Sequence, residues 1–226
     1  MKNEQRFNIV MIGATGAVGS QVVKSLIPSQ QLQRLTLLGR NSLEEIVSDR
    51  VQQHTVDVLQ ADSYLSLLSG HQVAICTLGV GQPSKVSKEV FLKIDKQAVL
   101  DFAKACKEAG VQHFELLSSV GINANSSSFY LRSKGELVEE IKALEFQRFS
   151  IFEPSMILTP TNRYGILQGI VLQVWPLLKP LLIGGLRKYR GVEVETLGRA
   201  IAQHVFLPKK GVEHLQWDDF QVVGRD

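Results

Sequence analysis

A glycine-rich loop directly after the first apolar run limits this chain to few folds. Three glycines follow the run Phe7–Ile12 at intervals of three residues: Gly13, Gly16 and Gly19. Glycine allows a sharp turn where a strand ends and leaves space for a pyrophosphate close to the main chain. We predict a helix beginning near Ala17, since apolar residues then recur four positions apart: Val18, Val22 and Leu26. Strand, glycine turn and helix in this order predict a dinucleotide site, with a purely structural turn as the alternative.

Size and composition favour one domain. The chain has 226 residues, of which 44% are hydrophobic, and it contains no linker-like run of Pro, Gly and Ser. Its formal net charge of +3 is dispersed, so a nucleic-acid partner is not expected. Cys76 and Cys106 are expected to be reduced, buried thiols. The polar residues before the first strand do not resemble a signal peptide, so we expect a cytoplasmic protein.

Strand-like runs alternate with helical patterns through the first two thirds of the chain. The runs are Phe7–Ile12, Arg34–Leu38, Val51–Val56, Gln72–Leu78, Gln112–Leu117 and Arg148–Phe152. This alternation predicts an α/β fold of the Rossmann type, with a doubly wound parallel sheet. We expect one domain, residues 1–226, in which 1–154 form a cofactor-binding core. Residues 155–226 are expected to form a small C-terminal helical cap and substrate region, with a late strand near Leu215–Val222.

The most hydrophobic stretch, Ile166–Ile183, lies within this expected cap. Its length approaches the roughly 18 residues that would suggest a membrane-spanning helix. Two prolines and a lysine interrupt it: Pro176, Lys179 and Pro180. We therefore expect an apolar cap over the active site or a contact in a homodimer. Peripheral contact with a membrane is the alternative, since exposed apolar surface also serves that purpose.

Arg40 follows the second strand, about 20 residues beyond the glycine loop. NAD-dependent proteins usually have an acidic residue at this distance, where it binds the ribose hydroxyls. An arginine can instead bind the 2′-phosphate of NADP through parallel hydrogen bonds, so Arg40 and its neighbour Asn41 are candidate NADPH-binding residues. The alternative is a solvated arginine at a strand end. Asp57, after the third strand, could accept a hydrogen bond from adenine or serve a turn.

A second group of polar residues follows the fifth strand. Ser118 and Ser119 end that strand, and on the next predicted helix two residues stand four positions apart: Tyr130 and Lys134. A carbonyl reductase needs a phenol to transfer a proton, an ammonium to favour the phenolate, and a hydroxyl to bind the substrate oxygen. These four residues are therefore candidate catalytic residues. The alternative is a surface tyrosine and a solvated lysine.

Together, these motifs resemble the atypical short-chain dehydrogenases, and among them the oxidoreductase-like Tat-interacting proteins. The resemblance extends over about residues 7–206 and is most specific at Ser118–Glu136. It implies a Rossmann fold that binds NADPH, with Tyr130 and Lys134 at the nicotinamide ribose. It places one run near the pyrophosphate: Thr15, Gly16, Ala17 and Val18. It also implies four further cofactor contacts: Leu78, Gly79, Ile157 and Arg163.

One segment departs from this resemblance. Many relatives have Arg-Pro-Gly after the sixth strand, where this chain has Glu153, Pro154 and Ser155. Phosphates repel a carboxylate, so Glu153 is expected to point away, to pair with a cation such as Arg163, or to contact substrate.

The candidate residues predict an NADPH-dependent reductase that passes hydride to a small carbonyl compound or an activated double bond. Tyr130 would supply the proton, and a serine would polarise the oxygen. The alternative is an NADPH-loaded binding or regulatory protein, which has a protein partner and little turnover. No metal site is expected, because the five histidines show no short ligand spacing.

Overall fold

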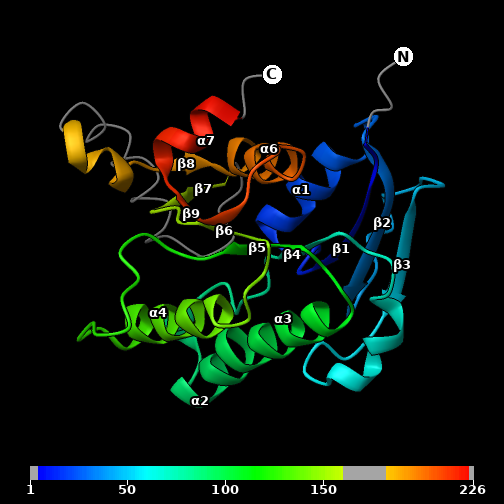
Figure 1. Cartoon of the computed structure of the whole chain (residues 1–226). Coiled ribbons are helices and arrows are strands. Elements are labelled where there is room, and N and C mark those ends of the chain that lie inside the picture. Colours follow the sequence, from blue (N-terminus) through cyan, green and yellow to red (C-terminus); the bar gives the residue numbers. More distant parts are fainter. Residues whose placement is uncertain (1–4, 160–181, 224–226) are drawn as a thin grey trace.

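The central feature of the fold is a parallel β-sheet, seen edge-on in Figure 1. The computed structural model describes residues 5–159 and 182–223. Seven strands follow the order β3-β2-β1-β4-β5-β6-β9. Their bounds are β1 Phe7–Ile12, β2 Leu32–Gly39, β3 Val51–Thr55, β4 Val73–Cys76, β5 His113–Leu117, β6 Arg148–Phe152 and β9 Gly211–Leu215. The order reverses between β1 and β4, as in doubly wound sheets, which confirms the predicted Rossmann-type fold class.

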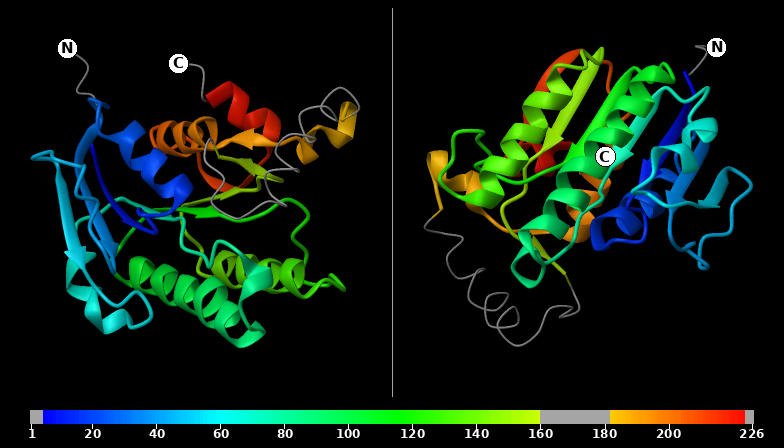
Figure 2. Two further views of the ribbon diagram at one scale, coloured as in Figure 1. Left: turned by 180° about the vertical axis from the view of Figure 1, so that it is seen from behind. Right: turned by 90° about the horizontal axis from the view of Figure 1, so that it is seen from below.

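Helices cover both faces of the sheet (Figures 1 and 2). One face carries α1 (Ala17–Leu26), α6 (Val194–His204) and α7 (Trp217–Val223). The other carries α2 (Lys88–Phe91), a π-helical segment (Leu92–Ala98), α3 (Val99–Glu108) and α4 (Phe129–Lys142). Three short 3₁₀ turns lie in the connections: Ala61–Ser63, Leu65–Leu67 and Pro83–Lys85. The central strands are therefore buried on both sides, which explains why β1 and β4 are apolar almost throughout.

The alternation of side chains along β1 divides the core into two parts. Ile9 and Met11 belong to the buried cluster under α1 and α6, whereas Val10 and Ile12 belong to the cluster over α3 and α4. The predicted apolar face of α1 is buried as expected: Val18, Val22 and Leu26. The glycine turn that joins β1 to α1 is thus held between two packed elements.

The late strand lies earlier than we predicted. The sequence pattern placed it near Leu215–Val222, but β9 spans Gly211–Leu215 and pairs in parallel with β6. The residues that follow form α7, because Trp217 and Phe220 stand three positions apart and are both buried. A spacing of three places both rings on one side of a helix and on opposite sides of a strand.

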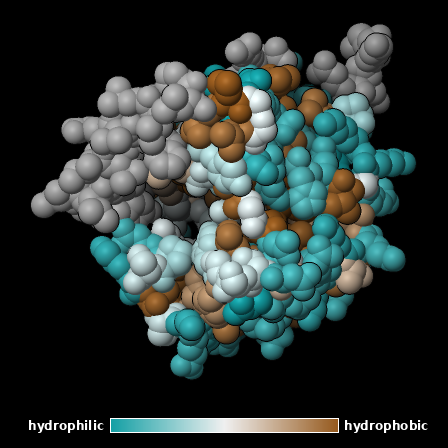
Figure 3. Space-filling view, turned by 90° about the vertical axis from the view of Figure 1, so that its left-hand side faces the viewer, coloured by the Kyte–Doolittle hydropathy of each residue, from teal (hydrophilic) through white to brown (hydrophobic). Residues whose placement is uncertain are grey.

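The region expected as a cap also contributes to the main layers, because it supplies α6, β9 and α7. Its other described elements are small: β7 (Ile157–Leu158), which pairs with β8 (Val192–Glu193), and a 3₁₀ helix (Gly184–Tyr189). Residues 160–181, which include most of Ile166–Ile183, lie outside the described part. Figure 3 shows hydrophobic side chains among hydrophilic ones on the face of the molecule that it draws. Within the described ranges, no helix has the length and hydropathy to span a bilayer.

Candidate cofactor and active site

The turn between β1 and α1 has room for glycine alone at two positions. Gly13 has φ +85°, and a Cβ there would lie 2.5 Å from the carbonyl carbon of Thr77. A Cβ at Gly19 would lie 2.1 Å from the Gly13 oxygen. The Thr77 hydroxyl donates to that same oxygen at 3.0 Å, which fastens the turn to the end of β4. The turn is therefore held in one conformation, with the start of α1 directly behind it.

A cavity of about 430 Å³, here called the main cavity, lies at the start of α1. One wall is formed by Gly16, Ala17, Val18 and Gly19. Other residues come from the ends of β4 and β5, from α4 and from the chain after β6: Leu78, Gly79, Ser118, Tyr130, Lys134 and Ile157. Parallel strands bring their carboxyl ends to one edge of a sheet, and such edges are where doubly wound folds bind ligands. The structure thus brings together residues that the sequence placed far apart.

Three of the four candidate catalytic residues line the main cavity. Ser118 does so with a buried hydroxyl that has no hydrogen-bond partner in the described parts of the chain. The Tyr130 ring packs on the Phe91 ring, with 5.6 Å between centroids, and is half-buried. Lys134 is buried on the next turn of α4, consistent with the four-residue spacing. Ser119 is not among the residues that line this cavity.

Asp95 is a site residue that the sequence reasoning missed. Its Oδ1 lies 3.0 Å from Lys134 Nζ, and both side chains are only 6% exposed. Asp95 also lines the main cavity. The sequence contains one sign of this role, because Asp95 stands four positions after Phe91 and three before Ala98, where a helix would have an apolar residue. No spacing rule connects Asp95 with Lys134.

A smaller cavity of about 70 Å³, here called the side cavity, lies on the other side of the glycine turn. It is lined by Gly13, Thr15, the loop Gly39–Leu43 and Leu78, and Leu78 also lines the main cavity. Arg40 and Asn41 are exposed at this place. The Gln53 side chain fixes the loop, because it donates to the Leu43 carbonyl and accepts from the Leu43 N–H. No carboxylate occurs among the described residues that line the side cavity.

Two further candidate residues, Asp57 and Glu153, line neither cavity and contact other parts of the fold instead. Asp57 accepts hydrogen bonds from the Leu59 N–H (3.0 Å) and the Gln60 side chain (2.9 Å), so it fills the turn role that was left open. Arg163 falls outside the described residues. Glu153 is buried and faces β9, where its carboxylate contacts His214 Nδ1 at 2.6 Å. His214 is therefore a partner of the Glu153 carboxylate.

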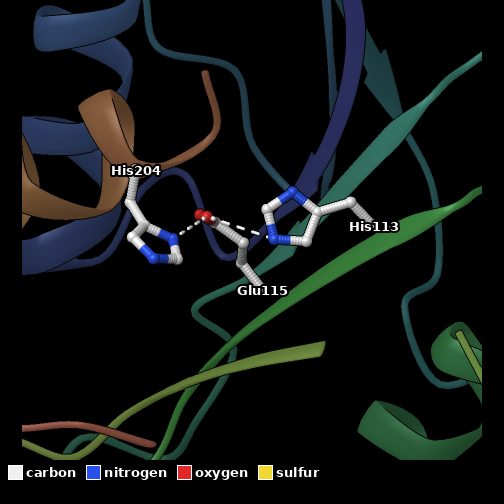
Figure 4. A group of neighbouring side chains, drawn as sticks. All are labelled: His113, Glu115 and His204. Atoms are coloured by element: carbon white, nitrogen blue, oxygen red, sulfur yellow. Dashed lines mark hydrogen bonds and ion pairs between the residues drawn. The ribbon is translucent and has the colours of Figure 1, made fainter. Parts of the chain in front are cut away.

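A second polar cluster is buried between the sheet and α6. It contains His113 and Glu115 on β5, Arg148 and Ser150 on β6, Glu213 on β9 and His204 on α6. Figure 4 shows Glu115 between the two imidazole rings, with its Oε1 2.9 Å from His204 Nδ1 and 3.5 Å from His113 Nε2. The sequence reasoning found no metal-ligand spacing, yet these three side chains meet in space.

Charge balance explains this cluster better than a metal ion does. A guanidinium nitrogen of Arg148 lies 2.8 Å from His204 Nε2, and a cation would have to share that space. Arg148 Nε also contacts Glu213 at 2.8 Å. Burial and the nearby Arg148 guanidinium act to lower the pKa of His204, but hydrogen bonds to Glu115 and Glu213 outweigh both effects and raise that pKa. Two carboxylates therefore face one guanidinium and one imidazolium, which is the pairing that buried charges require.

This network predicts that stability depends on His204 in alkaline solution. The unfolded chain releases the His204 proton near pH 6.5, whereas the folded protein keeps it to a higher pH. The corresponding stability is complete below pH 6.5 and is lost as the pH rises through the folded pKa. Urea unfolding from about pH 7 to about pH 9 should show declining stability in the wild type. The His204→Gln variant should be less stable by about 1–3 kcal/mol and should show a flatter profile.

The partly exposed His54 offers a matched control for this experiment. The His54→Gln variant should keep the wild-type slope, because His54 lies outside the buried cluster. An unchanged slope in His204→Gln would contradict the role given to this histidine.

The comparison of the sequence with known families covers the side cavity and the main cavity as far as Lys134. Residues 13–153 match a family described as NAD(P)H-binding. The chain belongs to this NAD(P)H-binding family. The match begins at the glycine turn and includes Tyr130 and Lys134, and it confirms the family resemblance inferred from the motifs.

Relatives within and around this NAD(P)H-binding family agree with that assignment. The chain is 35% identical to Protein HTATIP2 of Rattus norvegicus over 156 residues, which cover 68% of this chain and 64% of the rat protein. The match therefore spans slightly less than two thirds of that relative's length. The chain is also 30% identical to Protein FMP52-1, mitochondrial, of Scheffersomyces stipitis over 195 residues, or 84% and 80% of the two chains. The predicted likeness to Tat-interacting proteins is thus confirmed.

Solved structures support the fold of this family member. MoeE5 in complex with UDP-glucuronic acid and NAD superposes with a TM-score of 0.69 at 16% identity, covering 92% of this chain and 76% of MoeE5. The oxidoreductase ylbE from Lactococcus lactis gives 0.66 at 17% identity and covers 95% of each chain. At these identities the likeness concerns the fold alone.

The expectation of a cytoplasmic protein is wrong. It rested on the polar residues before the first strand, whereas several fungal relatives are named mitochondrial, including those of Scheffersomyces stipitis and Debaryomyces hansenii. The composition of a few residues is weaker information about location than the names of relatives that align over most of the chain.

Proposed function

We propose that this NAD(P)H-binding protein is an NADPH-dependent reductase of a small carbonyl compound or activated double bond. The observation that carries the proposal is one shared cavity, lined by the start of α1 and by Ser118, Tyr130 and Lys134. A protein that only bound a cofactor would have no chemical use for a phenol at this place. The substrate would occupy the part of the main cavity beside these side chains.

The residues of the turn fit a dinucleotide. Cβ atoms at Gly13 and Gly19 would clash with the main chain of Thr77 and of Gly13, so only glycine lets the turn bring its backbone this close to the start of α1. The first N–H groups of α1 have no partners within the helix, and a helix N-terminus favours phosphate oxygens. The Ser118 hydroxyl, which has no hydrogen-bond partner among the residues that the structure describes, adds a polar group that can bind a ligand in the main cavity.

Arg40 supports NADPH rather than NADH. Its guanidinium stands at the side cavity, whose described lining contains no carboxylate to bind ribose hydroxyls. A guanidinium binds a phosphate through two charge-assisted hydrogen bonds, whereas a carboxylate would repel it. Asn41 and Thr15 line the same cavity and are the proposed neighbours of the adenosine ribose.

Tyr130, Ser118 and Lys134 have different roles in the proposed proton transfer. NADPH supplies a hydride when it is bound. Tyr130 donates its phenolic proton to the substrate oxygen, so that a carbonyl becomes a neutral alcohol. The Ser118 hydroxyl donates a hydrogen bond to the same oxygen while negative charge develops on it. The Lys134 ammonium stabilises the phenolate that remains on Tyr130, and its other N–H groups bind ribose hydroxyls.

A substrate screen tests this proposal. The purified protein is mixed with NADPH and a panel of uncharged aldehydes, ketones and enones, and cofactor absorbance is followed. We expect at least one compound to be reduced with a turnover well above the rate without protein. Tight NADPH binding with no turnover across the panel would instead support the regulatory alternative.

A further inference from the structure

The ion pair between Lys134 and Asp95 connects the proposed catalytic lysine to a second part of the main cavity. We propose that Asp95 is a positioning residue, which holds the Lys134 ammonium in place and couples it to the loop after β4. This inference rests on the proposed function, in which Lys134 binds the cofactor ribose. It adds an acidic residue to a site whose other proposed members are Ser118, Tyr130 and Lys134.

The backbone around Asp95 explains how an acid reaches this place. Asp95 lies in the π-helical segment Leu92–Ala98, between α2 and α3, and only Asp95 and Ala98 of that segment are buried. A π-helical turn shifts side chains relative to a regular α-helix and is found frequently at functional sites. The carboxylate thus faces α4, where Lys134 is 39 positions further along the chain.

Both carboxylate oxygens of Asp95 have defined partners. Oδ1 lies 3.0 Å from Lys134 Nζ, and Oδ2 accepts a hydrogen bond from the Val80 N–H at 2.8 Å. The loop approaches closely because residue 79 is glycine, since a Cβ there would lie 3.0 Å from Oδ1. Gly79 itself lines the main cavity. One carboxylate therefore fixes both the lysine and the main chain at the cavity wall.

Among the described residues that line the main cavity, no group other than Asp95 supplies the counter-charge that a buried ammonium needs. Burial raises the pKa of the Cys76 thiol to about 12, so this neighbour is neutral. Ser118 and Tyr130 bring a hydroxyl and a phenol to the same cavity. Lys96, beside Asp95 in the sequence, turns outward to Glu136 at 2.7 Å and does not compete for Asp95. An isolated buried ammonium is strongly unfavourable, and Asp95 is the ion-pair partner that this burial requires.

A double-mutant cycle with NADPH as the probe tests this coupling. Asparagine at position 95 has the same shape but one acceptor oxygen, so it cannot serve both Lys134 and Val80. We expect Asp95→Asn to weaken NADPH binding about tenfold in calorimetric titration, because Lys134 loses its fixed position. In a Lys134→Met background, the same change should alter the NADPH dissociation constant less than about twofold. The control Asp101→Asn removes a negative charge from a partly exposed side chain that contacts Gln97, and it should leave affinity unchanged.

Urea unfolding of the ligand-free variants separates this inference from the proposed function. Lys134→Met leaves Asp95 buried without its cation, so adding Asp95→Asn should raise the folding equilibrium constant of that variant rather than lower it. Equal losses of NADPH affinity in both backgrounds, or additive losses of stability, would overturn the positioning role. A wild type that binds no NADPH would refute the proposed function, while the unfolding cycle would still report whether the pair is coupled.

Discussion

Replacing Tyr130 by phenylalanine is expected to slow the reduction of whichever compound the screen identifies by at least about 100-fold, while NADPH still binds. The phenylalanine ring can keep the packing on Phe91, whose centroid lies 5.6 Å away, so the fold should be preserved. Only the proton donor is lost. A positioned general acid contributes about 10²–10⁴-fold to rate, and we expect turnover to fall within that range. Steady-state rates and a calorimetric titration with NADPH measure the two properties separately.

Tyr64 provides the matched control for this variant. It is a buried tyrosine in the core beside Phe102, its hydroxyl has no hydrogen-bond partner in the described residues, and it does not line the main cavity. Tyr64→Phe should therefore retain wild-type turnover. If Tyr130→Phe also kept more than half of it, the phenol could not be the proton donor.

Replacing Arg40 by alanine should weaken NADPH much more than NADH. Charge-assisted hydrogen bonds contribute about 1.5–3 kcal/mol, so NADPH affinity should fall about 10–100-fold. NADH lacks the 2′-phosphate, and its affinity should change less than about threefold. Because Arg40 is exposed, the NADPH effect should shrink at high salt. Titrations of wild type and variant with both cofactors, at two salt concentrations, measure these changes.

Arg6 offers a control for the loss of one positive charge. It is exposed and precedes β1, so it lies away from both cavity linings. Arg6→Ala should leave the ratio of NADPH to NADH affinity unaltered. Equal losses for the two cofactors in Arg40→Ala would remove the basis for NADPH preference.

Local patterns were sufficient to predict the NAD(P)H-binding family and the glycine turn between β1 and α1. The glycine turn is encoded within about one strand and one helical turn, and Tyr130 and Lys134 depend only on helical periodicity. The family match over residues 13–153 agrees with the NAD(P)H-binding part of that prediction. The order of strand, turn and helix, and the four-residue spacing on one helix, depend mainly on residues that are close in the sequence.

Contacts between distant segments could not be predicted in the same way. Asp95 reaches Lys134 because a π-helical segment turns it inward, and no residue pattern showed that turn. His204 joins β5 from α6, 89 positions after Glu115. The late strand was misplaced because β9 ends at Leu215, and Trp217 and Phe220 are buried on one side of a helix. These errors all concern residues whose environment depends on the assembled sheet.

A crystal structure with NADPH tests the central claim most directly, namely that one coenzyme spans both cavities and ends beside Tyr130. We predict pyrophosphate density at the start of α1, the 2′-phosphate within hydrogen-bond distance of Arg40, and the nicotinamide ring in the main cavity beside Ser118 and Tyr130. Density that places the nicotinamide away from Tyr130, or no coenzyme density at saturating NADPH, would contradict the account.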